Sequence, residues 1–192
     1  MPKVKTVLVG DAGVGKTCIA ERIVRGTYTA TSAATIGAAN QMVTLQTERG
    51  PITFNIWDTA GQEKYRSLAP MYFSGAYIAY LVFDITNKNS LNALDDFYTL
   101  LQQRAPEECI YILVGNKMDL ENQRQVTQDE AIDFSQRIGA VAYAETSALT
   151  GQGVREIFDI AASCENLKFD DDTMSQISSD LQPPQAQPKQ CC

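Results

Sequence analysis

The sequence predicts an α/β fold in which a doubly wound, mostly parallel sheet of six strands carries helices on both faces. Short apolar runs alternate along the chain with amphipathic helical patterns. Several of these runs are apolar at every position, which is typical of parallel strands covered on both faces. With 192 residues, of which 44% are hydrophobic, the chain is long enough for one compact domain and an appendage.

The first half of the chain predicts three strands and a helix. The apolar run 4–9 predicts a buried strand, and the pattern at 16–25 predicts a helix that ends at Gly26. The runs 41–46 and 52–58 flank a short turn and predict a hairpin. The second hairpin strand alternates, with Ile52, Phe54 and Ile56 on one face and Thr53, Asn55 and Trp57 on the other. Trp57 is therefore expected on the polar face, which indicates a contact surface.

The second half of the chain continues the alternation. The runs 77–84, 110–115 and 140–145 predict three further strands. Residues 127–130 have the pattern of a capping box, which opens a helix. Two more helices are indicated by apolar residues at helical spacing, namely Leu91, Leu94, Tyr98 and Leu101, and then Val154, Ile157, Phe158 and Ala161.

The composition sets limits on both domain organisation and function. The folded domain is expected at residues 3–165, and residues 166–192, rich in Ser, Gln, Pro and acids, are expected to form a disordered tail. The net charge of −7 argues against nucleic acid as a partner. The absence of histidine excludes His-ligated metals and His-dependent triads. The five cysteines fit neither a zinc site nor a disulfide framework, which indicates a reduced, cytosolic protein.

A phosphate-binding loop follows the first predicted strand. Residues 10–17 match G-x-x-x-x-G-K-[ST] between a strand and a helix. Backbone N–H groups there can point at phosphate oxygens, and these belong to Gly13, Val14, Gly15, Lys16, Thr17 and Cys18. Lys16 supplies a positive charge, and the Thr17 hydroxyl supplies a hard oxygen for Mg²⁺.

Two further motifs indicate the base and the chemistry. Asn116, Lys117 and Asp119 follow a predicted strand, and a carboxylate at Asp119 can accept from N1–H and the 2-amino group of guanine, which adenine lacks. In the segment 57–63, Asp58 can reach Mg²⁺, and the Gly61 N–H can approach a terminal phosphate. Gln62 can orient an attacking water, so we expect hydrolysis by positioning and electrostatics.

Together these residues resemble a small GTPase of the Ras superfamily, and within it the early-endosomal branch of the Rab family. The resemblance covers residues 4–165 and rests on the segments 10–17, 35–37, 57–63, 65–72, 116–119 and 145–148. It implies a monomer that binds GTP or GDP with Mg²⁺, hydrolyses GTP and regulates vesicle traffic. It also implies an exchange factor, an activating protein, a dissociation inhibitor or escort protein, and effectors.

The resemblance assigns further roles at matching positions. Thr35 would join Thr17 on Mg²⁺, Tyr28 would pack against guanine, and Lys117 would lie along the base. The segment that follows Glu145 would complete the base pocket through Ser147, Ala148 and Leu149, with the Ala148 N–H on the guanine oxygen. The effector surface would comprise Ile36, Asn40, Trp57 and Tyr72.

Several positions depart from or extend this pattern. Asn40 stands where Rabs usually place a phenylalanine, which removes apolar area from the effector surface. Leu149 replaces a common lysine, and its aliphatic chain can still pack on the base. The paired Cys191 and Cys192 resemble the Rab double-prenylation site, which would anchor the protein on the cytoplasmic face of endomembranes, expected at the early endosome.

Three alternatives remain at this point. A nucleotide kinase would share the phosphate loop, but it would not explain residues 116–119 or the paired terminal cysteines. A guanine-nucleotide-binding module with little hydrolysis would share every binding motif. A Rab of another membrane is the third, because Asn40 weakens the subfamily analogy.

Overall fold

The computed structural model describes residues 1–28, 37–61 and 69–170. The strands are β1 (Lys3–Val9), β2 (Ala38–Thr47), β3 (Gly50–Thr59), β4 (Ile78–Asp84), β5 (Ile110–Asn116) and β6 (Ala142–Thr146). The helices are α1 (Lys16–Arg25), α2 (Ala69–Phe73), α3 (Lys88–Asn92), α4 (Leu94–Arg104), α5 (Gln128–Arg137) and α6 (Val154–Ser163), with a 3₁₀ helix at Met118–Gln123.

The strands form one six-stranded sheet in the order β2-β3-β1-β4-β5-β6. Only the β2–β3 hairpin is antiparallel; the other neighbouring pairs are parallel. The predicted doubly wound α/β fold is therefore confirmed. Because β1 lies between β3 and β4, the connection after β1 leaves at the point where the strand order changes direction, and such points bind ligands in open sheets.

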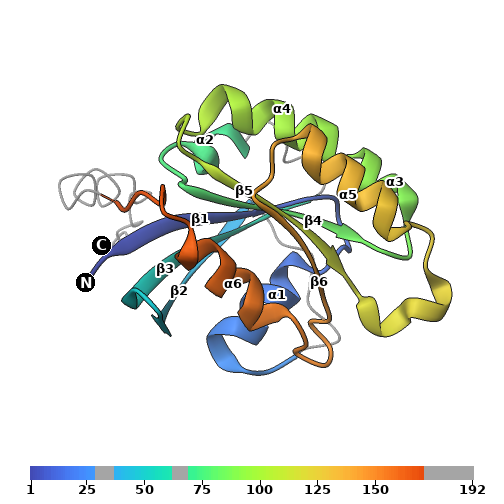
Figure 1. The fold of residues 1–192 in the computed structure, drawn as a ribbon, viewed down its shortest axis with the longest axis horizontal. Coiled ribbons are helices and arrows are strands. Elements are labelled where there is room, and N and C mark those ends of the chain that lie inside the picture. Colours follow the sequence, from blue (N-terminus) through green and yellow to red (C-terminus); the bar gives the residue numbers. More distant parts are fainter. Residues whose placement is uncertain (29–36, 62–68, 171–192) are drawn as a thin grey trace, which may run out of the picture.

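Two layers of helices cover the sheet (Figure 1). On one face, α1 and α6 pack through residues such as Ile19, Ile157 and Phe158 against one half of the core. The ring of Phe158 lies 5.2 Å from that of Phe54, centroid to centroid. On the other face, the helices α2 to α5 bury residues such as Phe73, Leu94 and Phe134. The strands β4 and β5 in the middle of the sheet are buried along almost their whole length, as the sequence predicted.

The hairpin alternation is present, and its second face is partly covered rather than fully exposed. Ile52, Phe54 and Ile56 are buried against α1 and α6. Trp57 points to the opposite face, where it packs beside the second core and is partly buried. Trp57 thus shares a face with Thr53 and Asn55, as expected, but it is only partly exposed because it packs against the Tyr72 ring and the Lys5 side chain.

The predicted helix limits have local causes that the structure shows. α1 ends at Gly26, which has a φ of 70° and donates its backbone N–H to the Arg22 carbonyl. At α5 the Thr127 side chain accepts from the Glu130 N–H, and the Glu130 side chain accepts in return from the Thr127 N–H.

Other elements differ from expectation. The helical stripe that begins at Leu91 is divided into α3 and α4 at Ala93. Tyr98 is only partly buried and packs edge-on against Tyr111. The short α2 and the 3₁₀ helix Met118–Gln123 were not predicted, because segments of five or six residues carry too few turns for a periodic signal.

The packed chain continues beyond the boundary expected at residue 165. Leu167 is buried, and the Asp170 N–H donates to the Lys3 carbonyl at 2.7 Å. The Lys5 N–H in turn donates to the Asp170 carboxylate at 3.0 Å. These contacts extend the body of the domain to at least Asp170. In the part of the chain that is described, no helix is long and apolar enough to cross a membrane.

Candidate nucleotide-binding site

The glycine-rich loop connects β1 to α1 at the carboxyl edge of the sheet. Gly15 is the residue before the first turn of α1 and has a φ of 99°. A Cβ atom at Gly15 would lie 2.2 Å from the Asn116 side-chain nitrogen, so only glycine fits there. Gly15 therefore provides no side-chain cap for α1, and the positive end of the helix dipole favours an anion at this N-terminus.

Lys16 lies inside this loop and is almost fully buried. Its Nζ donates to the carbonyl oxygens of Gly10, at 2.8 Å, and Asp11, at 2.7 Å. Burial lowers the pKa of Lys16 to about 8, although the nearby carboxylates of Asp58 and Asp11 oppose the shift. A phosphate bound at the loop would add an anion beside this cation and favour its charged form.

Thr17 and Asp58 meet next to the loop. The Thr17 hydroxyl donates to Asp58 Oδ2 at 2.6 Å, and Asp58 is buried at the end of β3. A hydroxyl and a carboxylate are hard oxygen ligands, and Mg²⁺ takes few protein ligands when phosphate and water supply the rest. The pair therefore fits Mg²⁺. Among the described residues, no cluster of three or more His, Cys, Asp or Glu side chains forms a metal cage.

The segment after Asp58 approaches the loop closely. Gly61 is buried, and a Cβ atom there would lie 2.4 Å from the Ala12 backbone nitrogen. This contact requires glycine at position 61 and brings the end of β3 against the phosphate loop.

Asn116 joins the phosphate loop to the predicted base-binding segments. Its side-chain N–H donates to the Val14 carbonyl at 2.8 Å. Its Oδ1 accepts from the Thr146 hydroxyl at 3.0 Å and from the Ala148 N–H at 3.3 Å. Three segments that are distant in sequence are thereby fixed around one side chain.

The remaining base-pocket residues lie beside Asn116. Ser147 Oγ donates to Asp119 Oδ1 at 2.5 Å and accepts from the Thr150 N–H at 3.1 Å. Lys117 adopts left-handed backbone geometry, with a φ of 69°, and pairs with Asp84. Leu149 is half exposed at the mouth of this region.

The sequence did not reveal three residues that hold the loops and side chains of the base pocket in place. Arg22 on α1 donates to the carbonyls of Ala148, at 2.9 Å, and Leu149, at 2.6 Å. Arg124 donates to both carboxylate oxygens of Glu145, at 2.8 and 2.7 Å. Asp84 pairs with Lys117. None belongs to a motif that touches a ligand, so no local pattern distinguishes these charges from surface charges.

The predicted effector residues that are described lie together on one side of the hairpin. The rings of Trp57 and Tyr72 are 5.7 Å apart, and Lys5 Nζ lies 4.9 Å from the Trp57 ring. Asn40 lies opposite Trp57 in the β2–β3 register and is exposed. Its side chain donates to Asn55 Oδ1 at 2.6 Å.

Five residues of the predicted site lie outside the described residues, namely Thr35, Ile36, Gln62, Cys191 and Cys192. Tyr28 is described and is exposed at the end of the segment that follows α1.

The chain is similar to known proteins over most of its length. The Ras family model matches residues 5–165. The Ras-related proteins Rab5 of Nicotiana tabacum and RABF2b of Arabidopsis thaliana are each 38% identical over 189 residues, which is 98% of this chain and 94% of the relative. A putative Ras-related protein Rab-5B of Dictyostelium discoideum is 44% identical over 154 residues, which is 80% of this chain and 71% of the relative.

The fold and the site define a P-loop nucleotide-binding domain with an oxygen pair suited to Mg²⁺ and a base pocket built on Asn116. The chain belongs to the Ras family, as a Rab small GTPase of the early-endosomal Rab5 branch, a class that regulates endocytic membrane traffic. The resemblance predicted from the motifs is thus confirmed.

Proposed function

We propose that this protein binds GTP and GDP together with Mg²⁺, hydrolyses GTP to GDP and phosphate, and alternates between two nucleotide states as a switch. One observation carries the proposal: Asn116 ties the phosphate loop at Val14 to the Ala148 N–H, so phosphate and base elements share one rigid edge. A loop that bound phosphate alone would need no such tie.

The nucleotide would be held at both of its ends. The N–H groups from Gly13 to Cys18 and the Lys16 ammonium bind the phosphates. Asp119 accepts from the guanine edge, while Tyr28, Lys117, Ala148 and Leu149 surround the base. Mg²⁺, when bound, neutralises phosphate charge, and Thr17, Asp58 and Thr35 supply oxygens for it.

Hydrolysis would depend on positioning rather than on a strong base. Gln62 orients the attacking water, and the Gly61 N–H meets the terminal phosphate. Because no histidine is present and one oriented amide gives modest acceleration, the reaction is slow until an activating protein completes the site. An exchange factor reopens the site, and effectors recognise the GTP state.

The proposed cellular place is the cytoplasmic face of early endosomes. Prenyl groups on Cys191 and Cys192 would anchor the chain, because two lipid chains hold a membrane where one holds only marginally. A dissociation inhibitor would carry the lipidated monomer through the cytosol. The relatives named Rab5 support an early-endosomal location. Because Asn40 removes apolar area from the effector surface, this protein can bind different effectors.

A nucleotide-specificity experiment tests the proposal. Purified protein is expected to bind fluorescent GDP in the presence of Mg²⁺ and to be displaced by GTP but not by ATP. Asp119→Asn replaces a carboxylate acceptor by an amide that can donate. The variant should therefore lose affinity for guanine nucleotides and gain affinity for xanthine nucleotides, whose base carries a carbonyl at position 2. Asp133→Asn, at an exposed position on α5, is the matched control and should change neither.

The same preparation separates the alternatives. Release of phosphate from bound GTP in a single turnover supports the switch. Phosphate transfer to a small acceptor would instead establish a kinase. Guanine binding without phosphate release, even when an activating protein is added, would establish a non-cycling module.

A further inference from the structure

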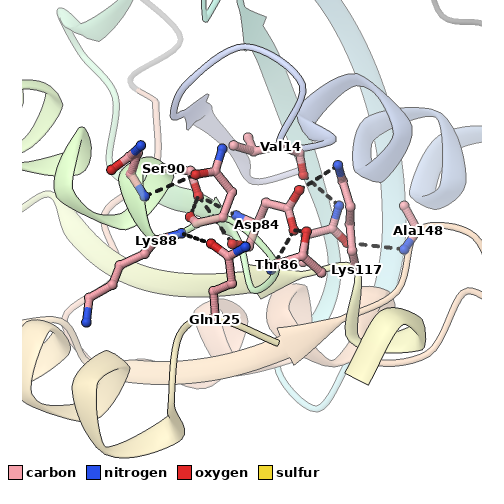
Figure 2. A network of polar contacts seen from close by, with 11 residues as sticks. Val14, Asp84, Thr86, Lys88, Ser90, Lys117, Gln125 and Ala148 are labelled. Atoms are coloured by element: carbon pink, nitrogen blue, oxygen red, sulfur yellow. Dashed lines mark hydrogen bonds and ion pairs between the residues drawn. The ribbon is translucent and has the colours of Figure 1, made fainter. Parts of the chain in front are cut away.

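Asp84 holds the ammonium group of Lys117 at the ends of two neighbouring strands (Figure 2). Lys117 Nζ lies 2.7 Å from Asp84 Oδ2, and the Asp84 side chain is only 10% exposed. Asp84 ends β4 in register with Asn116 of β5, so the residue after Asn116 comes within reach of this carboxylate. The pair therefore lies beside the base-pocket residues. Lys117 belongs to the guanine motif at residues 116–119, whereas Asp84 belongs to none of the motifs that the sequence shows.

The position of the Asp84 carboxylate is fixed independently of Lys117. Its Oδ1 accepts from the Thr86 N–H at 2.8 Å and from the Thr86 hydroxyl at 2.7 Å. The Asp84 backbone N–H donates to Ser90 Oγ at 2.9 Å. These contacts direct Oδ2 at a defined point, so the carboxylate acts as a fixed anchor rather than a mobile surface charge.

The other end of the Lys117 side chain is fixed by its backbone. Lys117 has φ 69° and ψ 36°, a left-handed conformation that a non-glycine residue adopts at a cost of about 1 kcal/mol or more. A long side chain restrained at its Cα and at its ammonium group has few remaining paths for the methylenes between them.

We propose that Asp84 is a positioning residue for guanine-nucleotide binding, which sets the path of the Lys117 methylene chain by holding its ammonium group. The inference rests on the proposed function, because Lys117 lies along a base only if guanine binds here. Asp84 itself would touch no nucleotide. Its loss would leave a cation on a flexible chain, which must be ordered again each time nucleotide binds.

A double-mutant cycle on nucleotide release tests the inference in the full chain. Asp84→Asn keeps an Oδ1 acceptor for Thr86 but removes the charge that faces Lys117. Lys117→Met keeps an apolar chain and removes the ammonium group. The rate of release of fluorescent GDP is measured for the wild type, each single variant and the double variant. Asp95→Asn, which removes a half-exposed ion pair with Arg137, is the matched control.

The expected result is a release rate about tenfold faster for Asp84→Asn than for the wild type, as for one lost charge-assisted contact. In the Lys117→Met background the same substitution should change the rate by less than about twofold, since the contact is already absent. Asp95→Asn should release GDP at the wild-type rate. Asp84→Glu, which keeps the charge, should release GDP more slowly than Asp84→Asn. If Asp84→Asn does not fold, Asp84→Ser, which also removes the charge, replaces it in the cycle.

Two results would overturn the positioning role. An unchanged release rate in Asp84→Asn would show that the ion pair does not contribute to binding. An equal acceleration in both backgrounds would assign Asp84 to the stability of the 84–90 turn instead. A folded wild-type chain that takes up no guanine nucleotide would overturn the proposed function itself, which is a separate outcome from either of these.

Discussion

At the scale of single residues, some side chains of the site can contact a ligand, and others hold the ligand-binding loops in place. Lys16, Thr17 and Asp119 carry atoms that can face a nucleotide. The Asn116 side chain instead forms its hydrogen bonds with Val14, Thr146 and Ala148. An amide donates and accepts at once, so it can join a carbonyl to an N–H across segments. A carboxylate at this position could not donate to Val14.

Gln62→Leu is expected to slow hydrolysis while nucleotide binding is retained. Leucine has no atom that can orient water, and misplacing a reacting group costs roughly a hundredfold in rate. Single-turnover phosphate release with an activating protein measures the effect, and fluorescent GDP affinity measures the binding. Gln136→Leu, at an exposed position on α5, is the control. A rate equal to that of the wild type would remove Gln62 from the mechanism.

Asn40→Phe is expected to strengthen binding of early-endosomal Rab effectors to the GTP-bound chain. The change gives up an exposed hydrogen bond to Asn55 and adds apolar area next to Trp57. Burial of that area in a complex should contribute about 1–2 kcal/mol. Titration of immobilised GTP-bound protein with such an effector measures it, and equal or weaker binding would count against this assignment of the surface.

At the scale of elements, loops at the strand ends are tied to one another by arginines behind the site. Arg124 follows the 3₁₀ helix Met118–Gln123 and binds Glu145 on β6 and Glu121 within the same turn. Hydrogen bonds to Glu145 and Glu121 raise the pKa of the Arg124 guanidinium, which therefore stays charged. The two base-pocket loops are in this way held at a fixed separation.

Arg124→Leu is expected to destabilise the fold more than the loss of a surface ion pair. Arg124 and Glu145 are only 14% and 12% exposed, so the change leaves a largely buried carboxylate without its cationic partner and with the Tyr143 hydroxyl as a neutral donor. We expect a loss of about 2 kcal/mol in the free energy of unfolding. Chemical denaturation measures it.

Arg137→Leu, which breaks the half-exposed pair with Asp95, is the matched control for that experiment. Its cost should stay within about 1 kcal/mol. Equal losses for the two variants would show that burial gives the Arg124–Glu145 pair no added importance.

At the scale of the whole molecule, helices pack through apolar cores against both faces of the sheet. The nucleotide-binding site lies at the carboxyl edge of the strands. The packed body extends past α6 to Asp170, where the chain lies against the start of β1. The Arg49 guanidinium donates to the Cys164 carbonyl at 2.8 Å and lies 5.8 Å from the Phe169 ring. These contacts hold residues 164–170 against the end of the sheet opposite the phosphate loop.

The Cys109 thiol is expected to report opening of the whole fold. Burial raises the pKa of Cys109 to about 12, from an ordinary value of 9.0, so the native thiol stays protonated and inert at pH 8 to 9. The stability that the neutral thiol contributes is complete below pH 9 and is lost as pH rises through about 12, because the unfolded thiol ionises first.

Alkylation with peptide mapping by mass spectrometry measures this reactivity. At pH 8.5, modification of Cys109 should be at least about 100-fold slower in the native chain than in denaturant, as for a site that reacts only after opening. Comparable rates in the two states would contradict the burial of this thiol.

The sequence by itself determined the strands, most of the longer helices, the phosphate loop and the guanine motif, because each rests on residues close together in the chain. A six-residue alternation or a glycine spacing records local backbone geometry directly. Tertiary structure alone decided the partial burial of Trp57, the packing as far as Asp170 and the roles of Arg22, Asp84 and Arg124. Each of these depends on a partner from a distant segment, and a charge that will be buried in an ion pair looks in the sequence like any surface charge.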